Sequence, residues 1–318
     1  MKAGILGYGE IGKAIASFYK DPKIRDLNRD DGFSDIDVLH VCIPYIKKFK
    51  TIVIKTVREA KIRNLIVIIH STVPPGTTKD IAEALFMVTP LVVHSPVRGV
   101  HPDLKKGIKT FVKFIGAQHR QAGVEAKKVF DSIGIKAEIF MPAISTEMAK
   151  VFSTTYYSMC IEWHREMDRV CKKHDIDFET ITAWNETYNS GYEELGSKQY
   201  ARPCLYPPPK KGIAGHCCLE NAILLREHTD VNKDFIDRIL SLGKHPDSIS
   251  ESRSILNRTW LYCEYWGKGK TASDIAKESG LSTKSVMAVM KKLDIPIRDQ
   301  EWAVSRFSKW FSWIKDKD

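Results

Sequence analysis

Cys217 is the residue whose type and surroundings best suit covalent chemistry in this sequence. A thiol is a nucleophile in its thiolate form, and Cys217 follows His216 and lies shortly after Lys210 and Lys211, whose charges favour that form. If Cys217 opens the helical stretch that runs to His228, the helix dipole favours the thiolate further. The alternative is a small packing residue in a core.

Lys150 is a second candidate, because a lysine on the inner face of a helix can stabilise a developing alkoxide. Its neighbours Met148, Val151 and Phe152 are apolar, which favours an inward position. The alternative is a solvated charge on the helix surface, the usual environment of a lysine.

A nucleotide-binding signature stands near the start of the chain, in Gly7-Tyr8-Gly9-Glu10-Ile11-Gly12. The apolar run before it predicts a strand and the segment after it a helix, which is the context in which G-x-G-x-x-G binds a dinucleotide. The first glycine permits a tight turn, the second lets the backbone approach a pyrophosphate, and the third allows close packing of helix on strand. We expect all six residues to bind the cofactor.

Asp26 bears on the choice of dinucleotide. It lies 19 residues beyond Gly7, near the end of a second strand, where an acid holds the ribose hydroxyls of NAD. Arg25 and Arg29 flank it and offer partners to the 2′-phosphate of NADP. The sequence therefore leaves NAD and NADP open.

Short buried runs alternate with helical stretches over the first half of the chain. This alternation predicts an α/β fold whose parallel sheet is covered by helices on both faces, a doubly wound sheet of the Rossmann type. Strands are predicted at 2–6, 37–43, 65–70, 91–94, 111–115 and 136–140, and helices at 11–19, 49–61, 78–86 and 121–132.

The pattern changes after Pro142, where residues 145–174 sustain helical periodicity and are expected to be buried or to form a homodimer. An irregular, aromatic-rich stretch follows to Tyr206, then a proline-rich loop at 207–212, and the polar segment 243–254 is typical of a linker. These changes predict three domains: a dinucleotide-binding domain (1–142), an all-α dimerisation and substrate domain (143–245) and a small helical C-terminal unit (255–318).

Composition indicates a globular protein with neither a metal centre nor a membrane span. The 318 residues are 43% hydrophobic and 28% charged, and the longest apolar run, 65–69, is far below the about 20 residues that cross a bilayer. The N-terminus has no signal-peptide pattern, and the seven cysteines include no C-x-x-C pair, so we expect free thiols in the cytoplasm. The net charge of +10 favours anionic partners such as nucleotides.

Three further segments follow the glycine loop in a characteristic order. They are Ser71-Thr72-Val73-Pro74-Pro75-Gly76-Thr77-Thr78, Glu147-Met148-Ala149-Lys150 and Gly212-Ile213-Ala214-Gly215-His216-Cys217. With them, residues 1–240 resemble the UDP-glucose/GDP-mannose dehydrogenase family, within the 6-phosphogluconate dehydrogenase-like superfamily. The resemblance implies an NAD(P)-dependent oxidoreductase that converts an alcohol of a nucleotide sugar into an acid, through an aldehyde, a cysteine thioester and its hydrolysis.

The resemblance also assigns roles by position. Cys217 matches the nucleophile, Lys150 the lysine beside the reacting oxygen, and Thr72 the threonine near the nicotinamide and the catalytic water. Residues at the ends of the later strands are expected to contact the cofactor: Ile43, Pro44, Ser71 and Thr72.

The chain departs from the family at three positions. Val97, Thr154 and Asn221 stand where the family has glutamate, asparagine and aspartate. The two lost carboxylates are tied to thioester hydrolysis and water positioning, so a two-electron hydroxyacid or phosphosugar dehydrogenase working through Lys150 stays open. No α/β pattern follows residue 240, where the family continues into a third domain, so the resemblance is to a truncated member and leaves the small-molecule substrate open.

The region after residue 255 resembles a small helix-turn-helix module. Thr271 or Ser273 caps a first helix, Gly280 stands in the turn, and a second helix follows at 283–293. This region carries only a modest excess of positive charge, so packing or protein contact is favoured over DNA binding.

DNA binding by this module stays open as a third interpretation, in which the protein is a dinucleotide-sensing regulator. Thr283, Lys284 and Ser285 would then face the major groove. Contacts to phosphates would come from Lys291, Lys292 and Arg298. The aromatic residues within 302–313 are expected to dock on the rest of the chain or on a second subunit.

Overall fold

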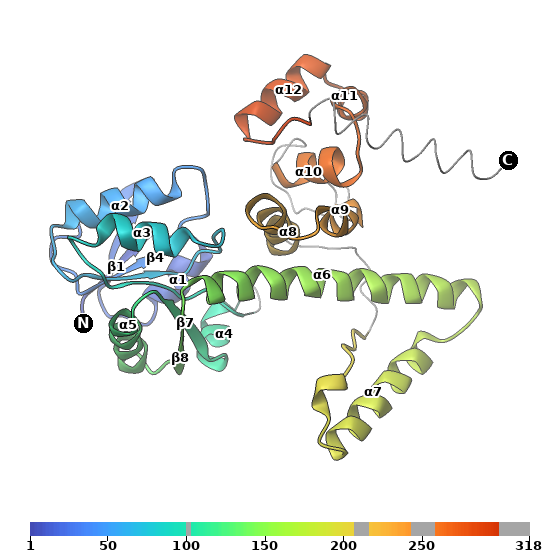
Figure 1. Ribbon diagram of the computed structural model, residues 1–318, viewed down its shortest axis with the longest axis horizontal. Helices are drawn as coiled ribbons and strands as arrows, with labels where there is room; N and C mark the ends of the chain where they lie inside the picture. The colour runs from blue at the N-terminus through green and yellow to red at the C-terminus, as the bar shows by residue number, and fades with distance from the viewer. Residues whose placement is uncertain (100–102, 207–215, 243–257, 299–318) are drawn as a thin grey trace. The chain divides into compact units, whose positions relative to one another are not determined.

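The computed structural model describes residues 1–99, 103–206, 216–242 and 258–298 (Figure 1). The chain forms two compact units, which are described separately. The first unit comprises Met1–Tyr157 and Asn221–Asn232, and the second comprises Ser158–Glu220 and the chain from Lys233 onward. The domain limits predicted from the sequence stay a prediction.

A single eight-stranded sheet forms the centre of the first unit, in the order β3-β2-β1-β4-β5-β6-β7-β8. Because β1 pairs with β2 on one side and with β4 on the other, the chain changes direction across the sheet at β1, which creates a switch point at the carboxyl ends of β1 and β4. The strands are β1 (Ala3–Leu6), β2 (Lys23–Asp26), β3 (Arg29–Asp30), β4 (Val38–Val41), β5 (Ile66–Ile69), β6 (Val92–His94), β7 (Lys113–Ala117) and β8 (Ala137–Phe140).

Helices cover both faces of this sheet (Figure 1). Buried side chains of α1, α4 and α5 share one apolar cluster with the sheet, and those of α2 and α3 share the other. These helices are α1 (Glu10–Ala16), α2 (Phe49–Ala60), α3 (Thr77–Leu85), α4 (Leu104–Thr110) and α5 (Arg120–Ser132). The doubly wound α/β fold predicted from the sequence is therefore confirmed.

The alternation of side chains along each strand explains the two clusters. Ile5 enters the cluster of α1 and α5, whereas Leu6 enters the cluster of α2 and α3. All four residues of β1 are buried, as expected for a strand that lies between two helix layers. Each large aliphatic side chain buried in this way contributes about 1.5–3 kcal/mol.

Two details of the sheet differ from the prediction of a wholly parallel arrangement. β7 runs antiparallel to β6, and β3 forms an antiparallel hairpin with β2. The connection from β6 to β7 contains α4, a short helix that was not predicted from the sequence. It begins at Leu104, after Asp103, whose side chain accepts a hydrogen bond from the Lys106 N–H and caps it.

The rest of the described chain is helical. The long helix predicted at 145–174 is present as α6. The prediction of an irregular stretch up to Tyr206 is wrong in part, because Asp177 caps a 17-residue helix there, α7. The elements are α6 (Ile144–Lys173), α7 (Phe178–Glu194), the 3-10 turn η1 (Lys198–Tyr200), α8 (His216–His228), α9 (Lys233–Leu242), α10 (Arg258–Tyr262), the π-helical turn η3 (Cys263–Gly267), α11 (Ala272–Ser279) and α12 (Thr283–Lys292).

Three predicted features fall outside the described residues: the loop at 207–212, the linker at 243–254 and the aromatic segment at 302–313. Among the helices that the structure describes, none has both the length and the apolar character needed to cross a membrane.

Candidate active site

The glycine loop leaves β1 at the switch point and is shaped by close backbone approaches. Gly7 has φ +94°, and a Cβ added to it would lie 2.8 Å from the backbone nitrogen of Ile43. A Cβ on Gly12 would lie 1.9 Å from the carbonyl oxygen of Gly7, so α1 could not pack where it does. A Cβ on Gly9 would meet no atom within 4 Å, so the backbone there borders open space that a pyrophosphate can approach.

Asp26 ties the glycine loop to the end of β2. Its carboxylate accepts hydrogen bonds from the backbone N–H of Tyr8 and, at 2.6 Å, from that of Leu27. The hydrogen bond from Tyr8 and then that from Leu27 hold the pKa of Asp26 below its ordinary value, so the exposed carboxylate is ionised at neutral pH.

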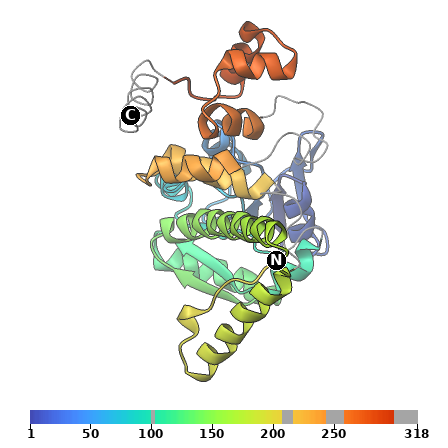
Figure 2. The ribbon, with the colours of Figure 1, turned by 90° about the vertical axis from the view of Figure 1, so that its right-hand side faces the viewer.

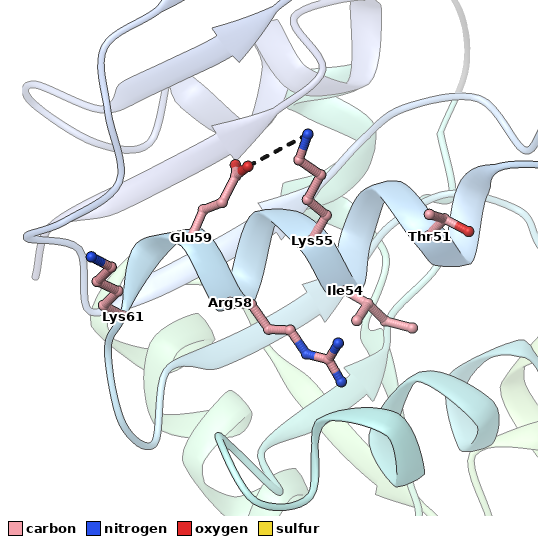
Figure 3. A pocket seen from close by; sticks show the side chains of 6 residues that line it. All are labelled: Thr51, Ile54, Lys55, Arg58, Glu59 and Lys61. Carbon is pink, nitrogen blue, oxygen red and sulfur yellow. Dashed lines mark ion pairs between the residues drawn. The ribbon is translucent and has the colours of Figure 1, made fainter.

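The two arginines that flank Asp26 are both paired with acids. Arg25 lies 2.9 Å from Asp30 and 2.9 Å from Glu59 of α2, and Arg29 lies 2.7 Å from Asp31. Figure 3 shows Glu59 on α2 with its second partner, Lys55. The hollow drawn there is lined by residues of α2 and Lys61, and none of the predicted site residues lines it.

The ends of β4 and β5 meet beside the glycine loop. The Ser71 hydroxyl donates a 2.6 Å hydrogen bond to the Ile43 carbonyl oxygen, which joins the two strand ends. Pro44 is exposed and Thr72 is half-buried, so both have surface that a ligand can reach. Because these strands are parallel, their carboxyl ends lie at the same edge as the glycine loop.

Glu147 attaches the first turn of α6 to the loop before α3. Its buried carboxylate accepts hydrogen bonds from the Gly76 N–H (2.6 Å), the Thr78 N–H (2.8 Å) and the Thr78 hydroxyl (2.6 Å). Burial raises the pKa of Glu147, although these three hydrogen bonds favour the ionised form. The Ser71–Thr78 and Glu147–Lys150 motifs are therefore in direct contact.

Lys150 follows one turn later on α6 and is half-buried. Its Nζ donates a 3.0 Å hydrogen bond to the carbonyl oxygen of Val97, in the segment that follows β6. Val97 therefore presents a backbone oxygen to the lysine at the position where the family has a carboxylate. This contact holds the ammonium group near the carboxyl edge of the sheet.

Lys113 is a polar residue that the sequence analysis missed. It is fully buried on β7, and its Nζ donates to the carbonyl oxygens of Ser95 (2.6 Å) and Pro96 (2.8 Å). Burial lowers the pKa of Lys113 well below its ordinary value. Two lysines, Lys113 and Lys150, thus hold three consecutive carbonyl oxygens. The alternation of residues along the strand gave no signal that Lys113 points inward.

Three buried histidines line the same part of the sheet. The Tyr19 hydroxyl lies 2.8 Å from His40 Nε2, His40 Nδ1 lies 2.9 Å from His70 Nε2, and His70 Nδ1 lies 2.9 Å from the Ser95 carbonyl oxygen. Since a carbonyl only accepts, His70 donates through Nδ1, accepts from His40 at Nε2, and leaves His40 to accept from Tyr19. Both His40 and His70 are therefore satisfied in their neutral forms.

His94, at the end of β6, is held in the same way. Its ring nitrogens lie 2.8 Å from the Thr146 hydroxyl and 3.2 Å from the Ser71 carbonyl oxygen. Burial lowers the pKa of His40 and of His94 to about 3. These histidines stiffen the floor of the site and are uncharged at neutral pH.

Two of the positions that depart from the family lie in contact. Asn221 of α8 donates a 2.7 Å hydrogen bond from Nδ2 to the Thr154 hydroxyl, which in turn donates to the Lys150 carbonyl oxygen at 2.9 Å. Asn221 is buried. The pair joins α8 to α6 without any ionisable group.

Cys217 is the second residue of α8, and its side chain, with residues 212–215, lies outside the described part of the chain. The next residue, Cys218, is buried. Within the described residues, no group of three or more His, Cys, Asp or Glu side chains could hold a metal ion.

The sheet order, the glycine loop at the switch point and the long helix that follows define a protein with a Rossmann-type dinucleotide-binding fold joined to a helical region. No family model matches the chain. The UDP-N-acetyl-D-mannosamine dehydrogenase of Pyrococcus horikoshii is 28% identical over 180 residues, 54% of this chain and 40% of the relative. That of Methanococcus maripaludis is 26% identical over 229 residues, 67% of this chain and 49% of the relative.

Solved structures show the same fold. UDP-D-ManNAc dehydrogenase from Pyrococcus horikoshii superposes with a TM-score of 0.63 at 19% identity, over 88% of this chain and 73% of that one. GDP-mannose dehydrogenase from Pseudomonas aeruginosa gives 0.51 at 15% identity, over 76% and 67%. The homologues confirm the resemblance to the UDP-glucose/GDP-mannose dehydrogenase family, and the chain spans 40% and 49% of the length of the two curated relatives named above.

Proposed function

We propose that the protein is an NAD-dependent dehydrogenase that oxidises an alcohol group of a nucleotide sugar. The observation that carries the proposal is the position of Lys150. Its Nζ is bound to the Val97 carbonyl oxygen, at the same edge of the sheet as the glycine loop and the Ser71–Thr78 motif. A cationic amine beside a dinucleotide loop is suited to stabilise the alkoxide of a substrate alcohol.

The residues of the switch point fit a dinucleotide. The backbone at Gly9 borders open space, and the strand ends contribute Ile43, Pro44, Ser71 and Thr72. Asp26 would accept hydrogen bonds from the ribose hydroxyls. We infer NAD over NADP because the anionic Asp26 would repel a 2′-phosphate, and because Arg25 and Arg29 are already paired with acids. When bound, the nicotinamide supplies the acceptor for the electrons of the alcohol.

Lys150 and Cys217 would divide the remaining chemistry. The Lys150 ammonium would donate a hydrogen bond to the substrate oxygen and stabilise the alkoxide, while the hydroxyl proton passes to solvent and the alcohol is oxidised to an aldehyde. The Cys217 thiolate would add to the aldehyde carbon, a second two-electron oxidation would give a thioester, and water would release the acid and the free thiol. Each oxidation consumes one NAD.

A two-electron dehydrogenase that works through Lys150 alone is the second candidate. The neutral contact between Thr154 and Asn221 favours it, because no carboxylate is left there to orient the hydrolytic water. The two candidates differ in the number of NADH molecules formed per substrate.

The substrate and the assembly follow from the relatives and from α6. The relatives are named for UDP-N-acetyl-D-mannosamine, so a UDP-sugar is the first substrate to test. One side of α6 exposes a row of apolar side chains, which we infer to be covered by a second copy of the chain: Phe152, Tyr156, Met159, Trp163 and Val170. The six cysteines with described side chains are free thiols, which fits the cytoplasm.

Substitution of Lys150 tests the proposal. Lys150→Met should lower kcat/KM for a UDP-sugar about 10²–10⁴-fold and leave NADH affinity unchanged, because the amine acts on the substrate. Lys79→Met, on the exposed side of α3, is the matched control and should keep full activity. Equal activity of the Lys150 variant would exclude the proposed role.

A further inference from the structure

The C-terminal part of the second unit is a helix-turn-helix module, and its surface is not used by the proposed oxidation. α11 and α12 pack against each other (Figures 1 and 2). A capping box between Thr271 and Asp274 begins α11, Gly280 ends it at φ +67°, and the Ser282 hydroxyl accepts from the Ser285 N–H at 3.1 Å to begin α12.

The inner side of the two helices is fixed by an apolar core. Ile275 and Ala276 of α11 and Val286 and Met290 of α12 are buried, as is Ile295 beyond the helix. This core determines which side of α12 is turned outward.

The preceding turn attaches the module to α9. A Cβ on Gly267 would lie 2.7 Å from the carbonyl carbon of Leu240, so η3 and α9 are in backbone contact. The indole N–H of Trp266 donates to the Pro296 carbonyl oxygen at 3.0 Å, which closes the module from its first turn to its last residues. Residues 258–298 are therefore a folded element.

Ion pairs within this module neutralise part of its charge. Residues 258–298 contain eight Lys or Arg and four Asp or Glu. Buried Glu264 pairs with Lys268 and Lys270, each at 2.7 Å, and Lys270 also pairs with Glu278 at 2.7 Å. Two of the four acids are thus neutralised by lysines next to the core.

The outward side of α12 carries the unneutralised lysines. Within the described residues, no acid lies within ion-pair distance of Lys284, Lys291 or Lys292. Ser285 and Ala288 separate them with small side chains that let a ligand approach the helix closely. All members of this face are exposed and recur at helical spacing: Leu281, Lys284, Ser285, Ala288, Lys291 and Lys292.

We propose that this face of α12 binds double-stranded DNA, with the first turn of the helix in the major groove. An α-helix fits that groove, and in a helix-turn-helix the start of the second helix contacts base edges. Thr283, Lys284 and Ser285 occupy that turn and are exposed. Lys291 lies about 10 Å farther along the helix axis, where it and Lys292 reach backbone phosphates.

The charge distribution favours a polyanion over a protein partner. A docking face for another protein would be expected to expose large apolar side chains at its centre, whereas this one presents Ser285 and Ala288 between lysines. Its one large apolar member, Leu281, lies before the first turn of α12. Arg298 is not part of the face. Its guanidinium lies 3.8 Å from the ring centroid of Tyr265 and donates to the Lys270 carbonyl oxygen.

Binding of the full-length chain to a fluorescent duplex of random sequence tests the proposal. The change of log Kd with log salt concentration should be steep. The triple variant Lys284→Ala, Lys291→Ala, Lys292→Ala should reduce that slope by about 0.9 for each lysine that contacts a phosphate. The control removes three exposed lysines of the first unit, Lys20, Lys109 and Lys136, and should leave the slope unchanged.

Two further arms separate duplex DNA from other ligands. An RNA duplex of the same sequence should bind at least tenfold more weakly, because its deep, narrow major groove excludes a helix. Selection from a randomised DNA pool should enrich a motif with the wild-type chain and a different or weaker motif with Thr283→Ala, Ser285→Ala. No DNA binding at low salt, equal binding of RNA, or equal loss in the control variant would overturn the proposal, whatever the result for dehydrogenase activity.

Discussion

The glycine loop and the Lys150 region lie at the same edge of one sheet but are built from different parts of the chain. The loop is made by backbone. Gly7 and Gly12 fit there because they have no Cβ, which would strike neighbouring backbone atoms. The Lys150 region is made by side chains from distant segments, held by hydrogen bonds such as that to the Val97 carbonyl oxygen. A site of the first kind tolerates almost no change, whereas a site of the second kind can change its chemistry by a few substitutions.

The largest effect is expected from closing the backbone approach in the loop. Gly12→Val should weaken NADH binding by at least 10–100-fold, because the side chain would strike the Gly7 carbonyl and overpacking costs about 1–3 kcal/mol. Fluorescence titration of NADH measures the effect. Gly191→Ala, on an open face of α7, is the control and should bind NADH normally. Unchanged NADH affinity in the Gly12 variant would mean that the loop does not hold the cofactor.

A second effect concerns the buried histidines beneath the Lys150 region. The pKa of His40 and of His94, about 3 in the folded chain, lies below the unfolded value near 6.5, so the unfolded state binds more protons between these limits. Stability is therefore fully present above pH 6.5 and should fall as the pH drops toward 3, by up to about 1.4 kcal/mol per pH unit for each histidine.

Hydrogen exchange of the β4 and β5 amides at pH 7 and pH 5, corrected for intrinsic rates, measures this loss. His40→Gln should reduce the pH dependence by about one proton, whereas His119→Gln, at the exposed start of α5, should leave it unchanged. An equal pH dependence in the wild type and the His40 variant would contradict the neutral buried state.

Asp26 is the side chain that contacts the glycine loop, whose shape is otherwise set by backbone. Asp26→Ser should weaken NAD binding about 10–100-fold through the lost charge-assisted hydrogen bonds to ribose and should bring NADP closer to NAD in affinity. Asp21→Ser, a nearby exposed acid, serves as the control. Retention of the full preference for NAD in the Asp26 variant would place the selectivity elsewhere.

The smallest effect is expected at the contact between Thr154 and Asn221. Thr154→Val and Asn221→Leu should each destabilise the first unit, and the double variant should show a coupling of about 0.5–1.5 kcal/mol, because one hydrogen bond is shared. Urea denaturation of the four chains gives this coupling. Strict additivity would show that the contact does not contribute.

The same contrast explains how far the sequence predicts the structure. The strands and the glycine loop are predicted well, because buried runs and glycine spacing are local properties of the chain. α7 is missed because its aromatic side chains, including Trp184 and Tyr188, are largely exposed and leave no apolar stripe at helical spacing. The burial of Lys113 could not be predicted, since it depends on the Ser95 and Pro96 carbonyl oxygens that the fold brings to it.

The roles of Cys217, Lys150 and Thr72 are inferred from motifs and stay predictions. What the structure adds is the pairing of motifs that are far apart in sequence, since Glu147 binds the segment that contains Gly76 and Thr78. Val97, which stands in place of a glutamate, offers its backbone oxygen to Lys150. Thr154 and Asn221, the other two departures, are hydrogen-bonded to each other.

The proposed four-electron oxidation can be measured by counting the NADH formed per molecule of UDP-N-acetyl-D-mannosamine and related UDP-sugars, with the wild type and Cys217→Ser side by side. We expect reduction of NAD in preference to NADP, with two NADH per substrate for the wild type and loss of the second in the serine variant. One NADH in both would establish the two-electron alternative through Lys150. Tight NADH binding without turnover of any of these sugars would show that the protein is not a dehydrogenase of these UDP-sugars.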